Sequence, residues 1–478
     1  MILVLERKRA SWLMIALLLS GAGCFTRVAT PELALIYNRS ARHHGPDRNP
    51  IIVIPGILGS KLWDRPTGTA VWGAFEPGAA NPEDPDGARQ VALPIRDAPL
   101  AELRDEVESN GVLDRVRVRL MGVPLEVQAY AGILRTLGAG GYRDEALGLG
   151  GEIDYGSDHY TCFQFDYDWR RDNVENARRL HDFIEEKRAY VQAQHHERFG
   201  VEDADVRFDI AAHSMGGLVT RYFLMYGDAE LPEDGSLPTL TWAGAPSVER
   251  VILIGTPNAG ALDALLELVR GKETGPLLPF YPPALLGTFP SIYQLLPRAR
   301  HEAVVWADDE DEAIDALDPA VWEDLGWGLA APNQDAVLEV LMPGVDDATT
   351  RREVALATQR RMLERARAFH QALDRPATAP PGLEMFLIAG DAMPTPNRVS
   401  VDRESGAVAV ADRGPGDGIV PRTSALLDER VGGRWEPRLV SPIDFGSVLL
   451  LPEEHLDLTM SEVFRDNVLF WLLEDPRP

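Results

Sequence analysis

The sequence predicts an α/β fold with a mostly parallel sheet, helices on both faces of that sheet, and two inserted subdomains. Short apolar runs recur along the chain, and several are directly followed by segments with helical patterning. Such runs are typical of parallel strands buried on both faces, and their alternation with helices is typical of α/β proteins. Two long segments that break this alternation indicate the insertions.

The predicted elements follow one another in a simple order. The first apolar run ends at Pro55-Gly56, which indicates a buried strand entering a turn. Strands are predicted within residues 51–60, 162–170, 206–214, 248–257, 384–390 and 438–445. Helices are predicted over 171–200, 216–227 and 461–475, and a hairpin over 398–412.

Residues 60–150 and 260–380 separate predicted core strands by far more than an ordinary connection. We therefore assign 48–258 and 381–478 to the core, with one inserted subdomain at about 60–150 and a lid or cap insertion at 259–380. The apolar, proline-broken stretch 275–297 within the second insertion suits a lid over an apolar pocket. The alternative interpretation is a hydrophobic arm buried on the core.

Composition excludes several classes of function. The chain has 478 residues and a formal net charge of -27, which repels phosphate backbones, so no nucleic-acid partner is expected. Contact with a membrane or lipid surface would have to be hydrophobic or covalent. The acidic run 307–318 lacks the spacing of a calcium loop, and the sequence has neither a zinc motif nor a glycine-rich phosphate loop. We expect no metal, no cofactor and no protein partner.

The N-terminus predicts export. Residues 1–24 combine a basic start, a short apolar stretch and small residues, as a signal peptide does, and 25–47 form a polar tether. The segment resembles a lipoprotein signal that is cut before a lipidated cysteine, here Cys24, although Gly21 stands where such signals usually carry leucine. Lipid attachment at Cys24 and plain secretion both stay open. The other cysteine, Cys162, lies in a predicted strand and is expected to be an unreactive core thiol.

Residues 211–217, AAHSMGG, place a serine between a predicted strand and a predicted helix. A serine needs a neighbouring base and exposure to act as a nucleophile, and a sharp strand-to-helix turn provides the exposure. Small residues two before and two after the serine, Ala212 and Gly216, let strand and helix pack closely around such a turn. Ser214 is therefore the candidate nucleophile, and the alternative is a plain helix N-cap.

The partners of Ser214 should follow in the order acid, then histidine. Of the histidines after Ser214, two fall in the second insertion and His455 follows the last predicted strand, so His455 is the candidate base. His213 is not expected to be the base, because adjacent side chains at a turn diverge. Asp391 and Asp417 are both candidates for the acid, and spacing alone slightly favours Asp391.

Six motifs, in this order, resemble those of the lecithin:cholesterol acyltransferase-like family of α/β-hydrolases, which includes lysosomal phospholipase A2 and phospholipid:diacylglycerol acyltransferases. They are IIVIPGILGSKLWD, FQFDYDWRRD, AAHSMGGLVTRY, VILIGTPNAG, TFPSIYQLLPR and GDGIVPRTSA. The resemblance implies the α/β-hydrolase fold, Asp417 as the acid, His455 as the base, and the backbone N–H groups of Ile57 and Met215 as oxyanion donors. Trp63 and Trp72 in the first insertion are candidates for lipid contact or for core anchors.

Together these features predict an exported or lipid-anchored serine hydrolase or O-acyltransferase that acts on lipid acyl esters, glycerophospholipids above all, through an acyl-enzyme. Water or an alcohol would take the acyl group. A carboxylesterase, a triacylglycerol lipase or an inositol deacylase of the same fold stays open. A non-catalytic lipid-binding relative is the alternative from another class.

Overall fold

The computed structural model describes residues 37–75, 78–113, 115–120, 123–128, 130–151, 153–155, 159–273 and 279–477. The predicted signal peptide, Cys24 and the first part of the tether lie outside these residues. Within them, none of the helices has the length and apolar character needed to cross a membrane.

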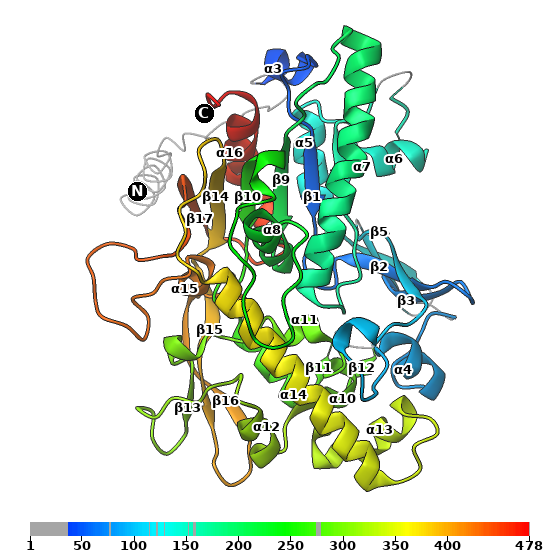
Figure 1. The fold of residues 1–478 in the computed structure, drawn as a ribbon, viewed down its shortest axis with the longest axis vertical. Helices are drawn as coiled ribbons and strands as arrows, with labels where there is room; N and C mark the ends of the chain where they lie inside the picture. Colours follow the sequence, from blue (N-terminus) through cyan, green and yellow to red (C-terminus); the bar gives the residue numbers. More distant parts are fainter. Residues whose placement is uncertain are drawn as a thin grey trace, which may run out of the picture.

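Within the described residues, a six-stranded parallel sheet forms the centre of the molecule (Figure 1). Its strand order is β17-β14-β10-β9-β1-β8, and every neighbouring pair is parallel. Strands β1, β9 and β10 are buried along their whole length, and apolar residues predominate in all three, as is typical of parallel strands covered on both faces. The strands are β1 (Ile51–Ile54), β8 (Cys162–Gln164), β9 (Phe208–His213), β10 (Val248–Ile254), β14 (Glu384–Gly390) and β17 (Ser447–Leu451).

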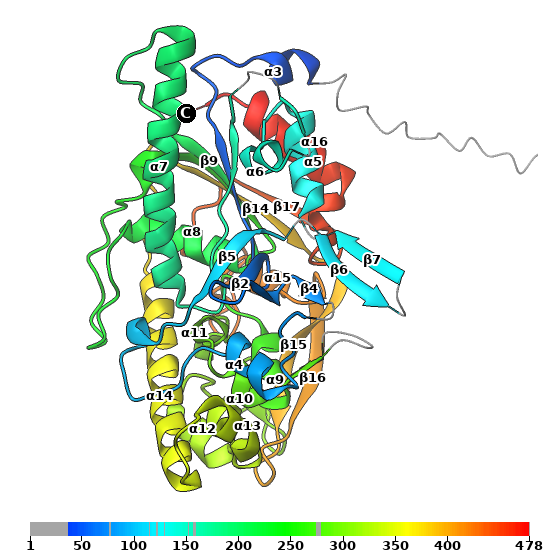
Figure 2. The same cartoon turned by 90° about the vertical axis from the view of Figure 1, so that its right-hand side faces the viewer.

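Helices cover both faces of this sheet, as the alternating pattern predicts (Figure 2). Side chains alternate across β1: Ile52 and Ile54 join the hydrophobic core beneath α7 and α8, whereas Ile51 and Val53 join a second core beneath α5 and α16. These covering helices are α7 (Asn173–Phe199), α8 (Met215–Tyr226), α5 (Ala131–Ala139) and α16 (Glu462–Leu473).

The last core strand differs from the prediction. Residues 438–445 form no strand, and β17 begins only at Ser447. Pro442 lacks a backbone N–H for a sheet ladder, and the N–H of Ile443 turns back to the Ser441 hydroxyl at 3.2 Å. The apolar residues of 438–445 therefore lie in a connection, and the following SVLLL pairs with β14.

The first long segment, 60–150, builds two small sheets beside the carboxyl ends of the core strands and then returns through α5. One sheet holds β2 (Ser60–Asp64), β3 (Thr69–Trp72) and β5 (Val107–Val112), and the other holds β4 (Ala74–Phe75), β6 (Arg115–Leu120) and β7 (Val123–Gln128). Its remaining helices are α4 (Pro85–Val91) and α6 (Glu145–Leu149).

The second long segment lies below the central sheet in Figure 1 and is mostly helical. Its strand β13 (Val304–Trp306) pairs with the hairpin of β15 (Met393–Val401) and β16 (Val408–Gly416), the hairpin predicted over 398–412. The helices are α9 (Leu262–Arg270), α10 (Pro283–Leu286), α11 (Pro290–Tyr293), α12 (Pro319–Leu325), α13 (Asp335–Leu341) and α14 (Ala348–Leu373). Two two-residue strands, β11 (Lys272–Glu273) and β12 (Phe280–Tyr281), complete it.

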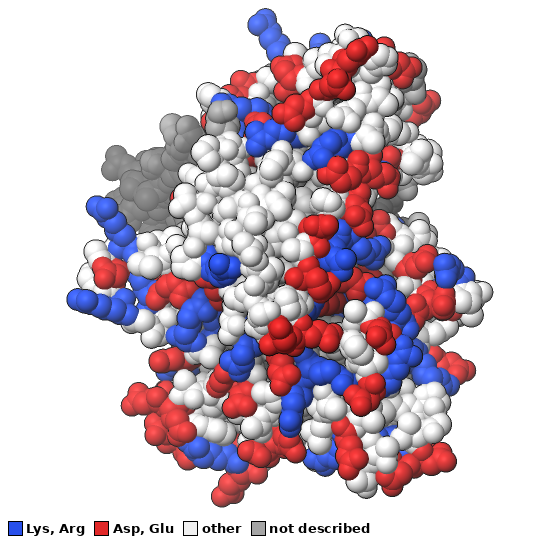
Figure 3. Space-filling view, in the orientation of Figure 1, with Lys and Arg blue, Asp and Glu red and all other residues white. Residues whose placement is uncertain are grey.

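Acidic residues are spread over the face of the molecule shown in Figure 3. On this face, acidic side chains are interspersed with Lys and Arg rather than gathered in one patch.

Cys162 is buried in β8, where it donates to Asp144 at 3.3 Å and burial raises the pKa of its thiol. An unreactive core thiol is what the sequence predicted.

Strand β9 and helix α8 approach the turn after β1 so closely that only small residues fit. A Cβ atom added at Gly216 would lie 2.4 Å from the carbonyl oxygen of Pro55, a backbone atom that cannot move aside cheaply. We predict that Gly216→Ala destabilises the protein by about 1–3 kcal/mol, measured by chemical denaturation. The control is Gly138→Ala in α5, where a Cβ meets nothing within 4 Å and which should stabilise by about 0.5–1 kcal/mol. Equal effects of the two variants would contradict the packing argument.

Candidate active site

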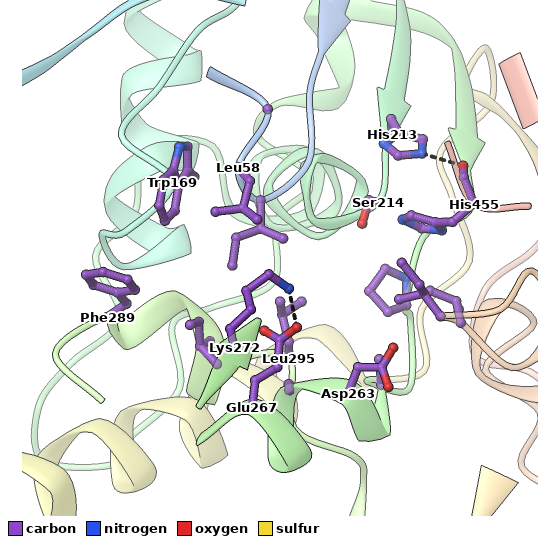
Figure 4. A pocket seen from close by; sticks show the side chains of 18 of the residues that line it. Leu58, Trp169, His213, Ser214, Asp263, Glu267, Lys272, Phe289, Leu295 and His455 are labelled. Carbon is purple, nitrogen blue, oxygen red and sulfur yellow. Dashed lines mark hydrogen bonds and ion pairs between the residues drawn. The ribbon is translucent and has the colours of Figure 1, made fainter. Parts of the chain in front are cut away.

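Ser214 lies at the tip of a sharp turn between β9 and α8. Its backbone has φ 53° and ψ -126°, a strained conformation for a residue with a Cβ atom, and its N–H donates to the Ile254 carbonyl on the neighbouring strand at 2.8 Å. Ser214 occupies the N-cap position of α8, but its side chain forms no capping hydrogen bond there, so its hydroxyl does not serve as a helix cap. The turn instead presents the hydroxyl to a cavity of about 350 Å³ (Figure 4).

His455 lines the same cavity and is held from behind by Asp417. Its Nδ1 lies 2.7 Å from Asp417 Oδ2, and its backbone N–H donates to the Asp417 carbonyl at 2.9 Å. Asp417 Oδ1 accepts the N–H groups of Ile419 at 3.0 Å and Val420 at 2.7 Å. Burial raises the pKa of Asp417, but the charge and hydrogen bond of His455 and the two amides outweigh it, so the net pKa is lowered. An ionised Asp417 accepts Nδ1–H and leaves Nε2 able to take a proton.

The structure brings Asp417 to His455, and not Asp391, which spacing alone favoured. Asp391 follows β14 directly, its N–H donates to the Leu451 carbonyl at 3.0 Å, and its carboxylate lies 3.7 Å from Arg422. The hairpin of β15 and β16 leaves and returns to the same sheet edge, so both acids lie there. A Cβ atom added at Gly390 would come within 2.5 Å of the Asp417 Cβ. The resemblance identified the paired acid, whereas chain distance could not.

The turn after β1 approaches Ser214 from the other side. A Cβ atom added at Gly56 would lie 2.6 Å from the Ser214 Cβ, so the two turns are in direct contact. Leu58 in this turn has φ 63°, and its carbonyl accepts the indole N–H of Trp72 at 2.7 Å. Among the described residues, the N–H groups of Ile57 and Met215 donate to no other group. Two unpaired amides beside a candidate nucleophile are suited to an oxyanion.

Apolar side chains from both long segments enclose the cavity. Trp72 is buried and lines it, whereas Trp63 is 37% exposed at the surface and does not line it. Most of the described part of the apolar stretch 275–297 is buried on the core, and it also forms a wall of the cavity, so it combines features of both interpretations. The apolar lining residues include Trp72, Trp169, Tyr281, Leu286, Phe289, Ile292 and Leu295.

One lining carboxyl group was not found from the sequence. Asp263 lies in the first turn of α9 and faces the cavity below His455 in Figure 4, beside an ion pair between Glu267 and Lys272. Burial, and next the charge of Glu267, raise the pKa of Asp263 to about 6. The available signal was its place shortly after the end of β10, where parallel sheets hold ligands.

Replacement of Asp417 and Asp391 by asparagine separates their roles with the same chemical change. We predict that Asp417→Asn lowers kcat on an ester substrate by about 10³-fold or more, because the histidine loses its anionic partner. The kcat of Asp391→Asn should stay within about threefold of the wild-type value. An inactive Asp391→Asn beside an active Asp417→Asn would contradict the geometry.

The raised pKa of Asp263 predicts a pH-dependent stability. The pKa of Asp263 is about 6 in the folded protein and 3.8 in the reference state. Its contribution to the free energy of unfolding therefore falls as pH rises through this window, and the full destabilisation applies above pH 6. Asp263→Asn should raise stability by up to about 3 kcal/mol at pH 8 and change little near pH 3.5. The control, Asp234→Asn, removes a carboxylate whose pKa is lowered by Ser236 and should bring no gain at pH 8. A gain independent of pH would contradict the assignment.

Comparisons with known proteins identify the family and the fold of the chain. The family model of lecithin:cholesterol acyltransferase matches residues 152–412, a region that includes Ser214 and ends before Asp417 and His455. A search of curated protein sequences finds no match. A chain of the Tle4–Tli4 complex is 14% identical over 90% of this chain and 98% of its own, with a TM-score of 0.54, which shows a common fold. Lipase 1 from Pelosinus fermentans is 12% identical over 90% of this chain and 99% of its own, with a TM-score of 0.33. Because the family match spans more than half of the chain, the protein belongs to the lecithin:cholesterol acyltransferase family of α/β-hydrolase enzymes.

Proposed function

We propose that the protein is a serine-dependent acyl-ester hydrolase or O-acyltransferase that acts on lipids, glycerophospholipids in particular. One observation carries the proposal. Ser214, on a strained turn, and His455, paired to Asp417 at 2.7 Å, line the same apolar cavity.

In the proposed reaction, His455 Nε2 takes the proton of the Ser214 hydroxyl as its oxygen attacks the ester carbonyl. The amides of Ile57 and Met215 donate to the oxyanion, and Asp417 stabilises the imidazolium that forms. The tetrahedral intermediate then collapses, the ester bond breaks, and His455 returns the proton to the leaving alcohol. Water or a second alcohol repeats these steps on the acyl-enzyme and releases an acid or a new ester.

The cavity supports an acyl chain as the bound part of the substrate. Each methylene group that the apolar walls remove from water would contribute about 0.8 kcal/mol to the free energy of binding. Ile419 and Leu456 line it and are 40% and 46% exposed, so apolar side chains mark its rim. A net charge of -27 offers no attraction to anionic lipid, so contact with a lipid surface would have to be apolar. The exposed side chains at the rim would make that contact. Export, with Cys24 either lipidated or removed, belongs to the same proposal and rests on the N-terminal sequence.

The acyl donor and acceptor can be determined in one assay. Vesicles of acyl-labelled phosphatidylcholine, with or without cholesterol or diacylglycerol, are incubated with wild type and with Ser214→Ala. Wild type should release labelled fatty acid or form a new labelled ester, and Ser214→Ala should lose about 10³-fold or more of both activities.

The ratio of acid to new ester separates hydrolase from acyltransferase. Turnover of a short nitrophenyl ester without any of the lipids would indicate a carboxylesterase of the same fold. An inactive wild type on all of these esters would favour the non-catalytic relative, and a fully active Ser214→Ala would exclude Ser214 as nucleophile.

A further inference from the structure

We propose that Tyr130 and His213 are positioning residues. Together they hold the loop that carries His455 and the turn after β1 in place around Ser214. This inference rests on the proposed function and adds two residues to it. Neither residue touches the reacting atoms in the proposed mechanism. Both act through the backbone groups that they bind.

A chain of hydrogen bonds links the three turns of the site. The N–H of Gly56, next to the oxyanion amide of Ile57, lies 2.8 Å from the Tyr130 hydroxyl oxygen. That oxygen lies 3.1 Å from His213 Nδ1, and His213 Nε2 lies 3.1 Å from the carbonyl oxygen of His455. One hydroxyl and one imidazole therefore connect the turn after β1, the turn after β9 and the loop that carries the base.

The proton inventory gives this chain a single direction. The Tyr130 oxygen accepts the Gly56 N–H, so its own proton points to His213 Nδ1. A neutral imidazole that accepts at Nδ1 carries its proton on Nε2, and this proton is donated to the His455 carbonyl. Every donor finds an acceptor, and neither ring needs a charge.

Burial keeps both groups neutral. Tyr130 and His213 are each 4% exposed, and burial raises the pKa of Tyr130 well above its ordinary value. Burial, then the neighbouring His455, lower the pKa of His213 to about 3. The rings of His213 and His455 are 4.7 Å apart, so a charged His213 would repel the imidazolium that His455 becomes in each catalytic cycle. Asp417 is the acid paired to His455, and Asp263 lines the cavity below it.

Tyr130 is supplied by the first long segment and not by the core. It directly precedes α5, its ring packs edge-on against His213 at 5.5 Å, and a Cβ atom at Gly59 would lie 2.8 Å from its hydroxyl. The inserted segment therefore contributes a polar side chain to the site beside the turn after β1.

Tyr130→Phe removes only the hydroxyl. It leaves the Gly56 N–H without its acceptor and lets His213 adopt the other tautomer, which cannot donate to His455. We expect kcat on a nitrophenyl ester to fall about 10- to 100-fold with KM within about threefold. The acidic limb of kcat/KM should move to lower pH, because a misplaced His455 is less well stabilised as imidazolium by Asp417.

The matched control is Tyr226→Phe. Tyr226 is buried in α8 and donates to the Ala372 carbonyl at 2.8 Å, outside the cavity, so its loss costs a comparable buried hydrogen bond. Tyr226→Phe should lower the melting temperature without changing kcat or the pH profile. A kcat loss of the same size in both variants, or an unchanged kcat and acidic limb in Tyr130→Phe, would overturn the proposal.

A second pair of variants tests His213 itself. His213→Gln keeps an N–H that can reach the His455 carbonyl, whereas His213→Leu does not, so the glutamine variant should retain at least about tenfold more kcat. Equal kcat values in folded His213→Gln and His213→Leu would overturn the proposed role of the hydrogen bond from His213 to the His455 carbonyl. Failure of this inference is distinguishable from failure of the proposed function. If only the roles of Tyr130 and His213 are wrong, Ser214→Ala is still inactive; if the proposed function is wrong, Ser214→Ala retains the activity of wild type or wild type itself is inactive.

Discussion

The contact between the turn after β1 and the turn after β9 is the constraint on which the rest of the site depends. Gly56 and Gly216 border this contact, and a Cβ atom at either would collide with the opposite turn. Leu58 and Ser214, on the two sides of it, both have positive φ although neither is glycine. Such conformations persist only where the surroundings fix them. Here the surroundings are the buried strands β1, β9 and β10.

The core and the inserted segments have different roles around this contact. Loops at the carboxyl ends of the core strands carry Ser214, Asp417 and His455, which the fold brings to one edge of the sheet from distant parts of the chain. The inserted segments supply the apolar walls of the cavity and the Tyr130 hydroxyl. Changes in the apolar walls would therefore affect which substrate binds, whereas loss of the Tyr130 hydroxyl would affect the proposed chemistry.

The sequence predicted best what depends on local pattern. The buried strands and the turn that carries Ser214 were recognisable because apolar runs and a small-residue turn are local features, and chain order pointed to His455 as the candidate base. Asp417 needed the family resemblance, since chain distance does not tell which of two acids at one sheet edge turns to the histidine. The strand expected at 438–445 was wrong because Pro442 and Ser441 form a connection there. Asp263 and Tyr130 were missed because their significance lies in long-range contacts.

The central claim is that the Ser214 hydroxyl is the nucleophile that the two turns and His455 activate. Labelling with a fluorophosphonate probe, followed by mass mapping of the modified peptide, tests it most directly. The account predicts one phosphonyl adduct on Ser214 and no labelling of Ser214→Ala. An adduct on another residue, or a Ser214→Ala variant that labels as strongly as wild type, would contradict it.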